Sequence, residues 1–310
     1  MLKQYPSVLN IAIIGQGAIG LLWAHHLASQ GHRITFVRRA GSTQPNHSQL
    51  VCNRGKESTR TFDTLNAQLP ESLDLVIITT KAYQVLSALE PLIPCIKETP
   101  LLLLHNGMGP VEQLKLSQEH HIMLATTSHG ALLESENSIR HTGIGLTMIG
   151  HFNGLDSQYT QHIATLLNNA LPEVQFTESI ERALWLKLAI NCAINPLTAL
   201  ENCRNGDLAA TRHEEIIENV CQEIALLTTC LGLDLGFEEI KATVYAVIDK
   251  TANNFSSMHQ DIIKQRPTEI DCINGYVVSK AEQLGIKVPY NLELYQKIKR
   301  RETTCHCSIT

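Results

Sequence analysis

The sequence lacks a long apolar run, a signal-like N-terminus and an excess of basic charge, and each absence excludes a class of protein. It contains no run of eighteen apolar residues, so we predict no membrane span. Its first ten residues lack the apolar core of a signal peptide. The net charge of −5, without a basic face, argues against nucleic-acid and anionic-membrane partners. We therefore expect a cytoplasmic protein.

Disulfides and metal sites are not indicated either. The nine cysteines are odd in number and scattered through helix and strand patterns, as reduced thiols are. The "CHC" at Cys305 to Cys307 suggests a metal-binding tail, but it has no matching second half, and we predict no metal. With 44% hydrophobic and 18% charged residues, the chain of 310 residues has the composition of a soluble globular protein, long enough for two domains.

Continuous apolar runs alternate with helical patterns in the first half of the chain. Such runs are typical of strands that are buried on both faces of a parallel sheet. The expected strands read "IAIIG", "RITFV", "LDLVIITT", "PLLLLH", "IMLATTSHG" and "GLTMIG". Their alternation with helices predicts an α/β fold with an N-terminal, Rossmann-type, doubly wound sheet.

The second half of the chain shows helical periodicity only. Strand runs stop near Glu181, and helices are expected at about 181–195, 213–231, 238–252, 257–265, 269–284 and 290–301. We therefore predict two domains. Residues 1–178 form the sheet domain, and residues 179–310 form an all-helical domain.

A glycine-rich turn follows the first expected strand. The turn "GQGAIG" has the spacing G-x-G-x-x-G and contains Gly15, Gln16, Gly17, Ala18, Ile19 and Gly20. The spacing alone is a weak signal, but here it joins a strand to a helix, which is the context of a dinucleotide site. The helix N-terminus would then present free N–H groups to a pyrophosphate. The alternative is a glycine-rich turn without a ligand.

The end of the second expected strand distinguishes NADP from NAD. An NAD enzyme usually has an acidic residue there, which binds the ribose 2′-hydroxyl. This chain has "FVRRAG", with Arg38 and Arg39 and no acid. Because arginine binds phosphate through paired hydrogen bonds, the two residues favour a 2′-phosphate and hence NADP(H). The alternative is a pair of exposed arginines with no ligand.

Polar residues follow three of the expected strands. Lys81 follows "VIITT", Asn106 follows "LLLLH", and the run Thr126, Thr127 and Ser128 follows "IMLA". In open α/β sheets, ligands bind outside the carboxyl ends of the strands. We therefore expect Lys81, Asn106 and Thr127 to contact the nicotinamide half of the cofactor or an anionic substrate.

An apolar helical segment carries a stripe of polar residues. In "ALWLKLAINCAINPL", Lys187, Asn191 and Asn195 are four residues apart, so they lie on one helix face within about 80°. Lysine is rarely buried without a partner, and an unpaired buried amide costs roughly 1–3 kcal/mol. The stripe therefore predicts a polar cleft, and the alternative is the narrow wet face of an amphipathic helix.

Two further segments have helix-capping patterns. In "NNFSSMHQDI", Ser257 and Gln260 have the capping-box spacing, and in "RPTEID", Thr268 reads as an N-cap followed by Glu269 in the first turn. Taken alone, Ser257 is explained as a cap, and Glu269 is explained as an acid that the helix dipole favours.

Together these stretches resemble the ketopantoate reductase (2-dehydropantoate 2-reductase) family. The matching stretches, which extend from Ile11 to about Arg301, read "GQGAIG", "TTKAYQV", "HNGMG", "TTSHG", "LWLKLAINCAINPLTAL", "NGDL", "SSMHQDI" and "TEIDCINGYVV". The resemblance implies a Rossmann domain, a helical domain and an active site in the cleft between them. It also implies NADPH-dependent reduction of ketopantoate to pantoate, in pantothenate and coenzyme A synthesis.

The resemblance also implies roles for individual residues. Lys187 resembles the catalytic lysine, which would stabilise the charge on the substrate oxygen and donate a proton. Glu269 resembles the acid that binds the substrate's hydroxyl. The remaining roles are substrate binding by Asn191, Asn195 and Ser257, contact with both cofactor and substrate by Asn106, and cofactor binding by Lys81. Arg39 is favoured over Arg38 as the 2′-phosphate ligand, although the choice stays open.

Two other functions remain open from the sequence. One is a related NADP-dependent reductase of another branched 2-keto acid or of a β-hydroxy acid, and the other is a non-catalytic NADPH-sensing protein. A sensor would not need the polar stripe, which is intact here. In all of these readings the partners are small molecules, without nucleic acid or membrane, and a homodimer is compatible with the sequence.

Overall fold

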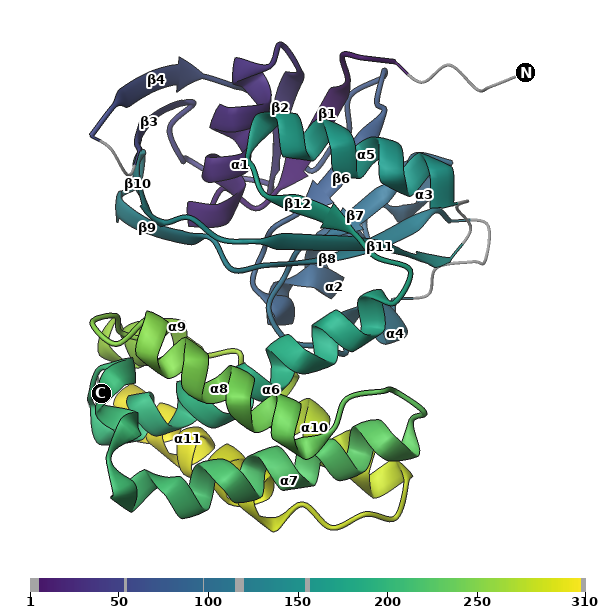
Figure 1. Ribbon diagram of the computed structural model, residues 1–310. Coiled ribbons are helices and arrows are strands. Elements are labelled where there is room, and N and C mark those ends of the chain that lie inside the picture. Colours follow the sequence, from purple (N-terminus) through teal and green to yellow (C-terminus); the bar gives the residue numbers. More distant parts are fainter. Residues whose placement is uncertain (1–5, 53–54, 97, 115–119, 154–156, 308–310) are drawn as a thin grey trace. The chain divides into compact units, whose positions relative to one another are not determined.

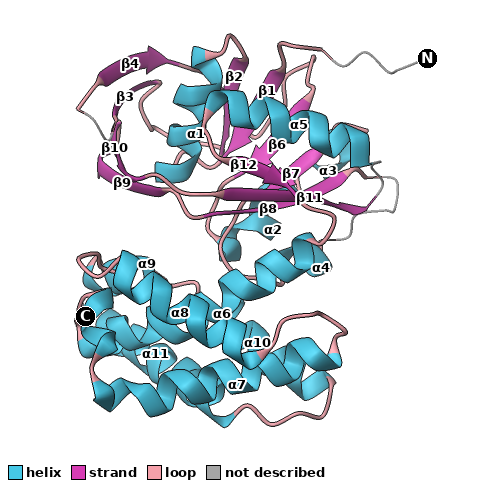
Figure 2. Cartoon of the chain, viewed as in Figure 1, coloured by secondary structure: helices cyan, strands magenta, loops and turns pink. Residues whose placement is uncertain are grey.

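A computed structural model describes residues 6–52, 55–96, 98–114, 120–153 and 157–307, with side chains described up to residue 303 (Figures 1 and 2). The side chains of the Cys305–Cys307 tail therefore lie outside the described part. Contacts within the chain divide it into two compact units. The first contains Met1–His105 and Glu112–Ile180, and the second contains Asn106–Val111 and Glu181–Thr310. We predicted one boundary after residue 178, and we did not expect residues 106–111 to join the helical unit.

An eight-stranded sheet forms the centre of the first unit. In sheet order its strands are β12 (Val174–Phe176), β11 (Thr147–Asn153), β8 (Ile122–Thr127), β7 (Leu101–Leu103), β6 (Leu75–Ile78), β1 (Asn10–Ile14), β2 (Arg33–Arg38) and β5 (Asp63–Asn66). Strand β11 runs antiparallel to β8, and all other neighbouring strands are parallel. All residues of β6 and β7 are buried, as their continuous apolar runs predict.

Helices cover this sheet on both faces, which confirms the predicted doubly wound fold. The helices of the first unit are α1 (Ala18–Ser29), α2 (Val85–Leu89), α3 (Ile93–Ile96) and α5 (Ser157–Ala170), and the short helix α4 (Pro110–Gln113) crosses the unit boundary. In Figure 1, α5 lies above the sheet and α2 lies below it. Leu21, Leu22 and Trp23 of α1 are almost fully buried, so the helix that follows the glycine turn is anchored in the core.

A second, four-stranded sheet in the first unit was not predicted. Its order is β4 (Glu57–Thr61), β3 (His47–Val51), β10 (Ser138–Gly143) and β9 (Gly130–Ser135). No residue of β4 is buried, so its sequence lacks the apolar alternation that indicates a strand. The strands β5 and β12 were also missed, because their four and three residues are too few to show a periodic pattern.

The second unit is all-helical, as predicted. Its helices are α6 (Ile180–Glu201), α7 (Glu214–Cys230), α8 (Phe237–Lys250), α9 (Ser257–Ile263), α10 (Asn274–Gln283) and α11 (Pro289–Cys307), with 3₁₀ turns η2 (Asn205–Ala209), η3 (Thr211–His213) and η4 (Ile270–Cys272). The predicted helix at 269–284 is in fact the turn η4 followed by α10, because Ile273 leaves the helical conformation with φ −108° and ψ −101°.

Helix α6 is apolar because it forms the core of this unit. Within the described part of the chain it is the one helix whose length and composition would suit a membrane span. However, Trp185, Leu188 and Ala193 are buried among the other helices, and most of the apolar window is buried. Its apolar character is therefore explained by packing within the protein.

Helix α6 also continues six residues beyond its predicted end at 195, although it contains Pro196. A proline cannot donate the hydrogen bond that the carbonyl of Cys192 would normally accept. The side chain of Asn274 replaces it, with Nδ2 at 3.2 Å from that carbonyl oxygen. The same Nδ2 donates to Asn291 Oδ1 at 2.9 Å, and Asn291 Nδ2 donates to Glu223 Oε2 at 2.8 Å. This buried network joins α6, α10, α11 and α7.

We predict that Asn274→Ala destabilises the protein by about 1–3 kcal/mol, because it leaves the Cys192 carbonyl and the Asn291 amide without their partner. Chemical denaturation measures the free energy of unfolding directly. Asn253→Ala, at an exposed position, is the matched control and should leave that free energy nearly unchanged. Equal stability of the two variants would show that the network does not stabilise the helix at Pro196.

Candidate active site

The glycine turn presents a helix N-terminus without a side-chain cap. Gly17 is the N-cap of α1, and Ala18 and Ile19 are its first two residues. No side chain caps the helix, and its first turn contains no acidic residue. A Cβ atom added to Gly17 would meet nothing within 4 Å. The described chain therefore leaves room at Gly17 for a phosphate group to approach the free N–H groups of α1.

The two outer glycines of the turn are required for packing. Gly15 has a φ of +112°, a conformation that other residues rarely adopt. A Cβ added to Gly20 would lie 2.0 Å from the Gly15 carbonyl oxygen and 2.5 Å from Thr79 Oγ1. Thr79 follows β6, and its hydroxyl donates to the Gly15 carbonyl at 2.8 Å. The turn is thus held against the ends of the strands, in the geometry that a dinucleotide site needs.

Arg38, at the end of β2, is tied to this turn. Its Nε donates to Gln16 Oε1 at 2.8 Å, its Nη2 to the Pro45 carbonyl at 2.8 Å, and its Nη1 to Asn46 Oδ1 at 3.0 Å. Gln16 Nε2 donates to the same Pro45 carbonyl at 2.9 Å. Partial burial lowers the pKa of Arg38, but guanidinium stays protonated. Arg39, by contrast, is exposed.

Lys81 and Thr127 both lie where a strand of the large sheet ends, but their surroundings in the structure differ. Lys81 precedes the short 3₁₀ turn η1 (Ala82–Gln84) after β6, which pairs with β1, so Lys81 and the glycine turn leave the sheet at the same edge. Thr127 ends β8, and its hydroxyl accepts hydrogen bonds from Thr147 Oγ1 at 2.8 Å and from the His129 backbone at 3.3 Å. Thr127 therefore has a structural role, and its contact with a cofactor stays a prediction.

Asn106 lies in the helical unit, beside Glu269. The backbone N–H of Met108 donates to the Cys272 carbonyl at 2.8 Å, which fixes the "NGMG" segment against η4. Gly107 has a φ of +78°, and a Cβ there would lie 2.4 Å from the same carbonyl oxygen. Asn106 Nδ2 donates to Glu269 Oε2 at 3.4 Å, although the two residues are 163 positions apart in sequence.

Lys187 interacts electrostatically with the same glutamate. Burial lowers the pKa of Lys187 to about 8, and the negative charge of Glu269 partly opposes that shift. Glu269 is 4% exposed. Along α6, Asn191 is half-buried and Asn195 is buried, one and two turns beyond Lys187. The structure thus brings Lys187, Glu269 and Asn106 together within the second unit.

The capping role expected for Ser257 belongs instead to Ser256. The Ser256 hydroxyl accepts a hydrogen bond from the His259 backbone at 3.1 Å and another from Thr198 Oγ1 at 2.7 Å. Ser257 is the first residue of α9, and its side chain is exposed. The contact with Thr198 sets the register of the cap, and no local sequence signal distinguishes two adjacent serines. Capping therefore does not account for Ser257.

The helix-dipole explanation also does not account for Glu269. The hydroxyl of Thr268 accepts a hydrogen bond from the Ile270 backbone at 3.2 Å, but the N-cap residue of the turn η4 is Glu269 and not, as the sequence predicts, Thr268. Glu269, however, is buried beside a lysine, whereas an acid that serves only the helix dipole needs no burial. That this carboxylate binds the substrate stays a prediction.

Comparisons with known proteins identify the family of this site. The family model described as "Ketopantoate reductase PanE/ApbA" matches residues 11–154, and the model of its C-terminal part matches residues 179–302. A 2-dehydropantoate 2-reductase from Vibrio cholerae is 44% identical over 95% of this chain and 98% of that protein.

Solved structures agree with these matches. A probable 2-dehydropantoate 2-reductase from Bacillus subtilis is 31% identical, with a TM-score of 0.81 over 94% of this chain and 100% of that one. A D-mandelate dehydrogenase in complex with NADH and anilino(oxo)acetate is 25% identical, with a TM-score of 0.89 over 96% of this chain and 100% of that one. The two family models together cover most of the chain, and the resemblance seen in the sequence is confirmed. This chain belongs to the ketopantoate reductase family.

Proposed function

We propose that this protein reduces 2-dehydropantoate (ketopantoate) to pantoate with NADPH, a step in pantothenate and coenzyme A synthesis. The observation that carries the proposal is the half-buried Lys187, with its lowered pKa, beside Glu269 and Asn106. Relatives named 2-dehydropantoate 2-reductase that match nearly the whole chain support the choice of substrate. Bound NADPH supplies the hydride that reduces the keto carbon.

The residues of the second unit bind the substrate and deliver the proton. Lys187 donates a hydrogen bond to the keto oxygen, stabilises the negative charge that develops there, and transfers its proton. Glu269, as a carboxylate, accepts a hydrogen bond from the substrate's hydroxyl. The amides of Asn106, Asn191 and Asn195 and the hydroxyl of Ser257 hold the substrate's carboxylate and carbonyl.

The residues of the first unit fit NADP(H). The uncapped N-terminus of α1 receives the pyrophosphate. We assign the 2′-phosphate to Arg38 in the first place, because its guanidinium is fixed beside the glycine turn, whereas the sequence favoured Arg39. Three of the five N–H groups of Arg38 have protein acceptors in the described part of the chain, which leaves two for a phosphate. Arg39, Lys81 and Thr127 of the same unit, together with Asn106 of the second unit, complete the proposed cofactor contacts.

The proposed reaction is tested with purified protein, NADPH and ketopantoate. We expect ketopantoate-dependent oxidation of NADPH, with one pantoate formed for each NADPH consumed. Binding of NADPH without turnover of ketopantoate or any other 2-keto acid would instead favour a sensor.

A second candidate function is the reduction of another 2-keto acid. The specific observation in its favour is the D-mandelate dehydrogenase structure, whose complex contains NADH and anilino(oxo)acetate and whose TM-score to this chain is 0.89. An aryl-substituted 2-keto acid lacks the hydroxyl that Glu269 binds in our proposal. Substrate preference therefore separates the two candidates.

We predict that Glu269→Gln has two separable effects. It should raise the KM for ketopantoate, because a neutral amide accepts the substrate's hydroxyl more weakly. It should also lower the pKa of Lys187 further below about 8, because the charge of Glu269 opposes the effect of burial. A proton donor is active below its pKa, so the alkaline fall in kcat should begin at a lower pH than in the unmodified enzyme. An unchanged pH profile of kcat would show that the two residues are not coupled.

We also propose that the enzyme is cytoplasmic. The support is that the described cysteines, Cys52, Cys95, Cys192, Cys203, Cys221, Cys230 and Cys272, are all free thiols. The homodimer that the sequence allows stays a prediction, which light scattering tests.

A further inference from the structure

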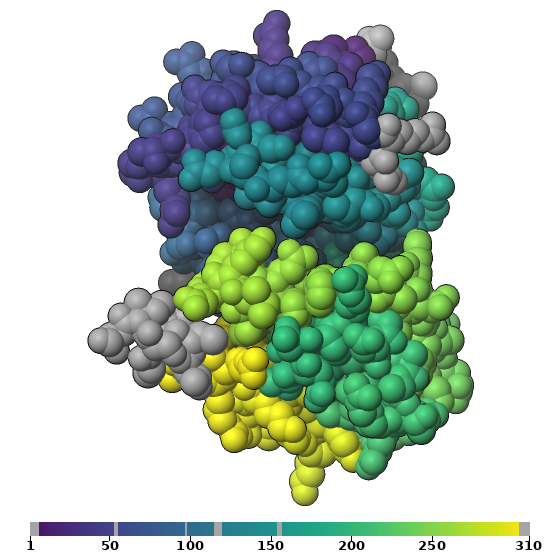
Figure 3. Space-filling model, turned by 90° about the vertical axis from the view of Figure 1, so that its left-hand side faces the viewer, coloured from purple at the N-terminus to yellow at the C-terminus, as the bar shows by residue number. Residues whose placement is uncertain are grey.

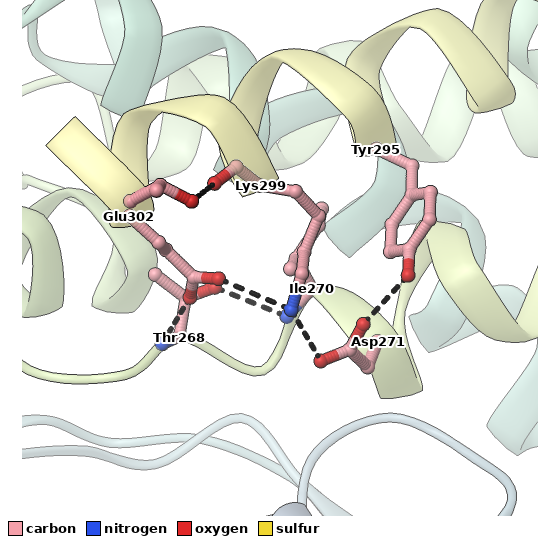
Figure 4. A network of polar contacts seen from close by, with 7 residues as sticks. Thr268, Ile270, Asp271, Tyr295, Lys299 and Glu302 are labelled. Carbon is pink, nitrogen blue, oxygen red and sulfur yellow. Dashed lines mark hydrogen bonds and ion pairs between the residues drawn. The ribbon is translucent and has the colours of Figure 1, made fainter.

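The C-terminal helix α11 holds the segment that carries Glu269 (Figure 4). Glu302 Oε1 accepts a hydrogen bond from the Thr268 backbone N–H at 2.8 Å. On the other side of Glu269, Asp271 Oδ1 accepts from the Tyr295 hydroxyl at 2.8 Å, and Asp271 Oδ2 accepts from Lys299 Nζ at 3.0 Å. Glu269 therefore lies between two neighbours that are both fixed to α11.

The three contacts come from one face of the helix. Tyr295, Lys299 and Glu302 are spaced at i, i+4 and i+7, which places them on the same side of α11. Lys299 Nζ also lies 3.4 Å from Glu302 Oε2, so one lysine links both anchors. We name this set of residues the α11 brace.

Burial distinguishes Glu302 from the rest of the brace. Its side chain is 15% exposed, whereas the side chain of Lys299 is 42% exposed and that of Asp271, the partner of Lys299, is 53% exposed. Exposed ion pairs contribute little to stability, while a partly buried carboxylate that accepts a backbone N–H makes a stronger hydrogen bond. Thr268 itself is buried, so its N–H would lack a partner without Glu302. Glu302 is thus the member of the brace with the largest expected effect.

We propose that Glu302 is a positioning residue for substrate binding, which holds the backbone at Thr268 so that the Glu269 carboxylate is fixed in its binding position. The inference rests on the proposed function, in which Glu269 binds the substrate's hydroxyl. Glu302 does not touch the substrate in this proposal. It acts by reducing the freedom of the segment before Glu269, and small displacements of a binding group are costly.

The test compares three substitutions on α11. Glu302→Ala removes the acceptor of the Thr268 N–H, and we expect the KM for ketopantoate to rise about tenfold while kcat and the KM for NADPH change less than about twofold. Glu302→Gln keeps an oxygen at the same place, so it should restore most of the substrate affinity. Glu293→Ala is the matched control, because it removes the exposed Glu293–Lys297 ion pair on the same helix without contacting the Glu269 segment. It should behave as the unmodified enzyme does.

A double-substitution cycle with Glu269→Ala separates the positioning role proposed for Glu302 from the substrate-binding role proposed for Glu269. If the brace acts through Glu269, adding Glu302→Ala to Glu269→Ala should not raise the KM for ketopantoate any further. Suppose that Glu269→Ala raises the KM for ketopantoate, but Glu302→Ala leaves it within twofold of the unmodified value. This result would refute the positioning role of Glu302 and leave the role of Glu269 intact. A normal KM in Glu269→Ala would remove the proposed role of Glu269 and the brace with it. Melting temperatures show whether Glu302→Ala is still folded. If it is not, the KM for ketopantoate of the Glu302→Gln variant is the deciding measurement.

Discussion

Replacing Lys187 by alanine should lower kcat by ~10²–10⁴, which is the usual contribution of a general acid. The side chain lies mid-helix on α6, so alanine preserves the helix and removes a charge whose burial lowers its pKa to about 8. The proposed cofactor contacts are in the other unit, apart from Asn106. Binding of NADPH should therefore survive, and steady-state kinetics together with NADPH titration measure the two properties separately.

Two further variants make this result specific. Lys187→Arg should remain inactive, because guanidinium does not release its proton near neutral pH. Lys241→Ala removes another lysine of the same unit, one that pairs with Glu218 on the neighbouring helix, and should leave kcat unchanged. A kcat of Lys187→Ala within about threefold of the unmodified enzyme would refute the role of Lys187, and Lys81 would then be the next lysine to test.

Replacing Arg38 by alanine should remove most of the preference for NADPH over NADH. Each charge-assisted hydrogen bond that is lost costs about 1.5–3 kcal/mol, so the KM for NADPH should rise by at least tenfold. The KM for NADH should change much less, because NADH has no 2′-phosphate. Arg39→Ala, at the adjacent exposed position, should have the smaller effect.

The pair of arginine variants also tests the assignment between them. A large loss of NADPH preference in Arg39→Ala, with little change in Arg38→Ala, would show that Arg39 and not Arg38 binds the 2′-phosphate. Equal use of NADH and NADPH by the unmodified enzyme would contradict both assignments. The ratio of kcat/KM for the two cofactors is the quantity to compare.

The parts of the fold that were predictable from sequence have local signals. A strand such as β6 is four apolar residues that are all buried, and α6 is a long, largely apolar helix that carries the polar stripe. The glycine turn also has a local cause, because Gly15 and Gly20 meet each other across a few residues. Short-range sequence patterns are sufficient in these cases.

The second sheet had no such signal. Strand β4 is polar and without a buried residue, and it is a strand only because it pairs with β3. Strand β10 pairs with β3 through Ser138 and Gln49, which are far apart in the chain. Pairing of this kind depends on the tertiary fold, so periodicity within one segment does not reveal it.

The candidate site was predictable in its residue types and less so in its contacts. A lysine and two asparagines on an apolar helix indicated a polar site, and the structure places Lys187 beside Glu269. The contact of Asn106 with Glu269 joins segments 163 residues apart, so no local pattern could reveal it. The hydrogen bond between Glu302 and Thr268 likewise joins residues that are far apart in the sequence. It depends on where α11 packs in the helical unit.

Substrate preference decides between the two candidate functions of this enzyme. The measurement is kcat/KM for ketopantoate and for a panel of other 2-keto acids, including an aryl-substituted one, each with NADPH and with NADH. We expect ketopantoate with NADPH to give the highest value, because Glu269 binds the hydroxyl that the aryl-substituted acid lacks and Arg38 binds the 2′-phosphate. A higher value for an aryl-substituted 2-keto acid with NADH would show that ketopantoate and NADPH are not the preferred substrates.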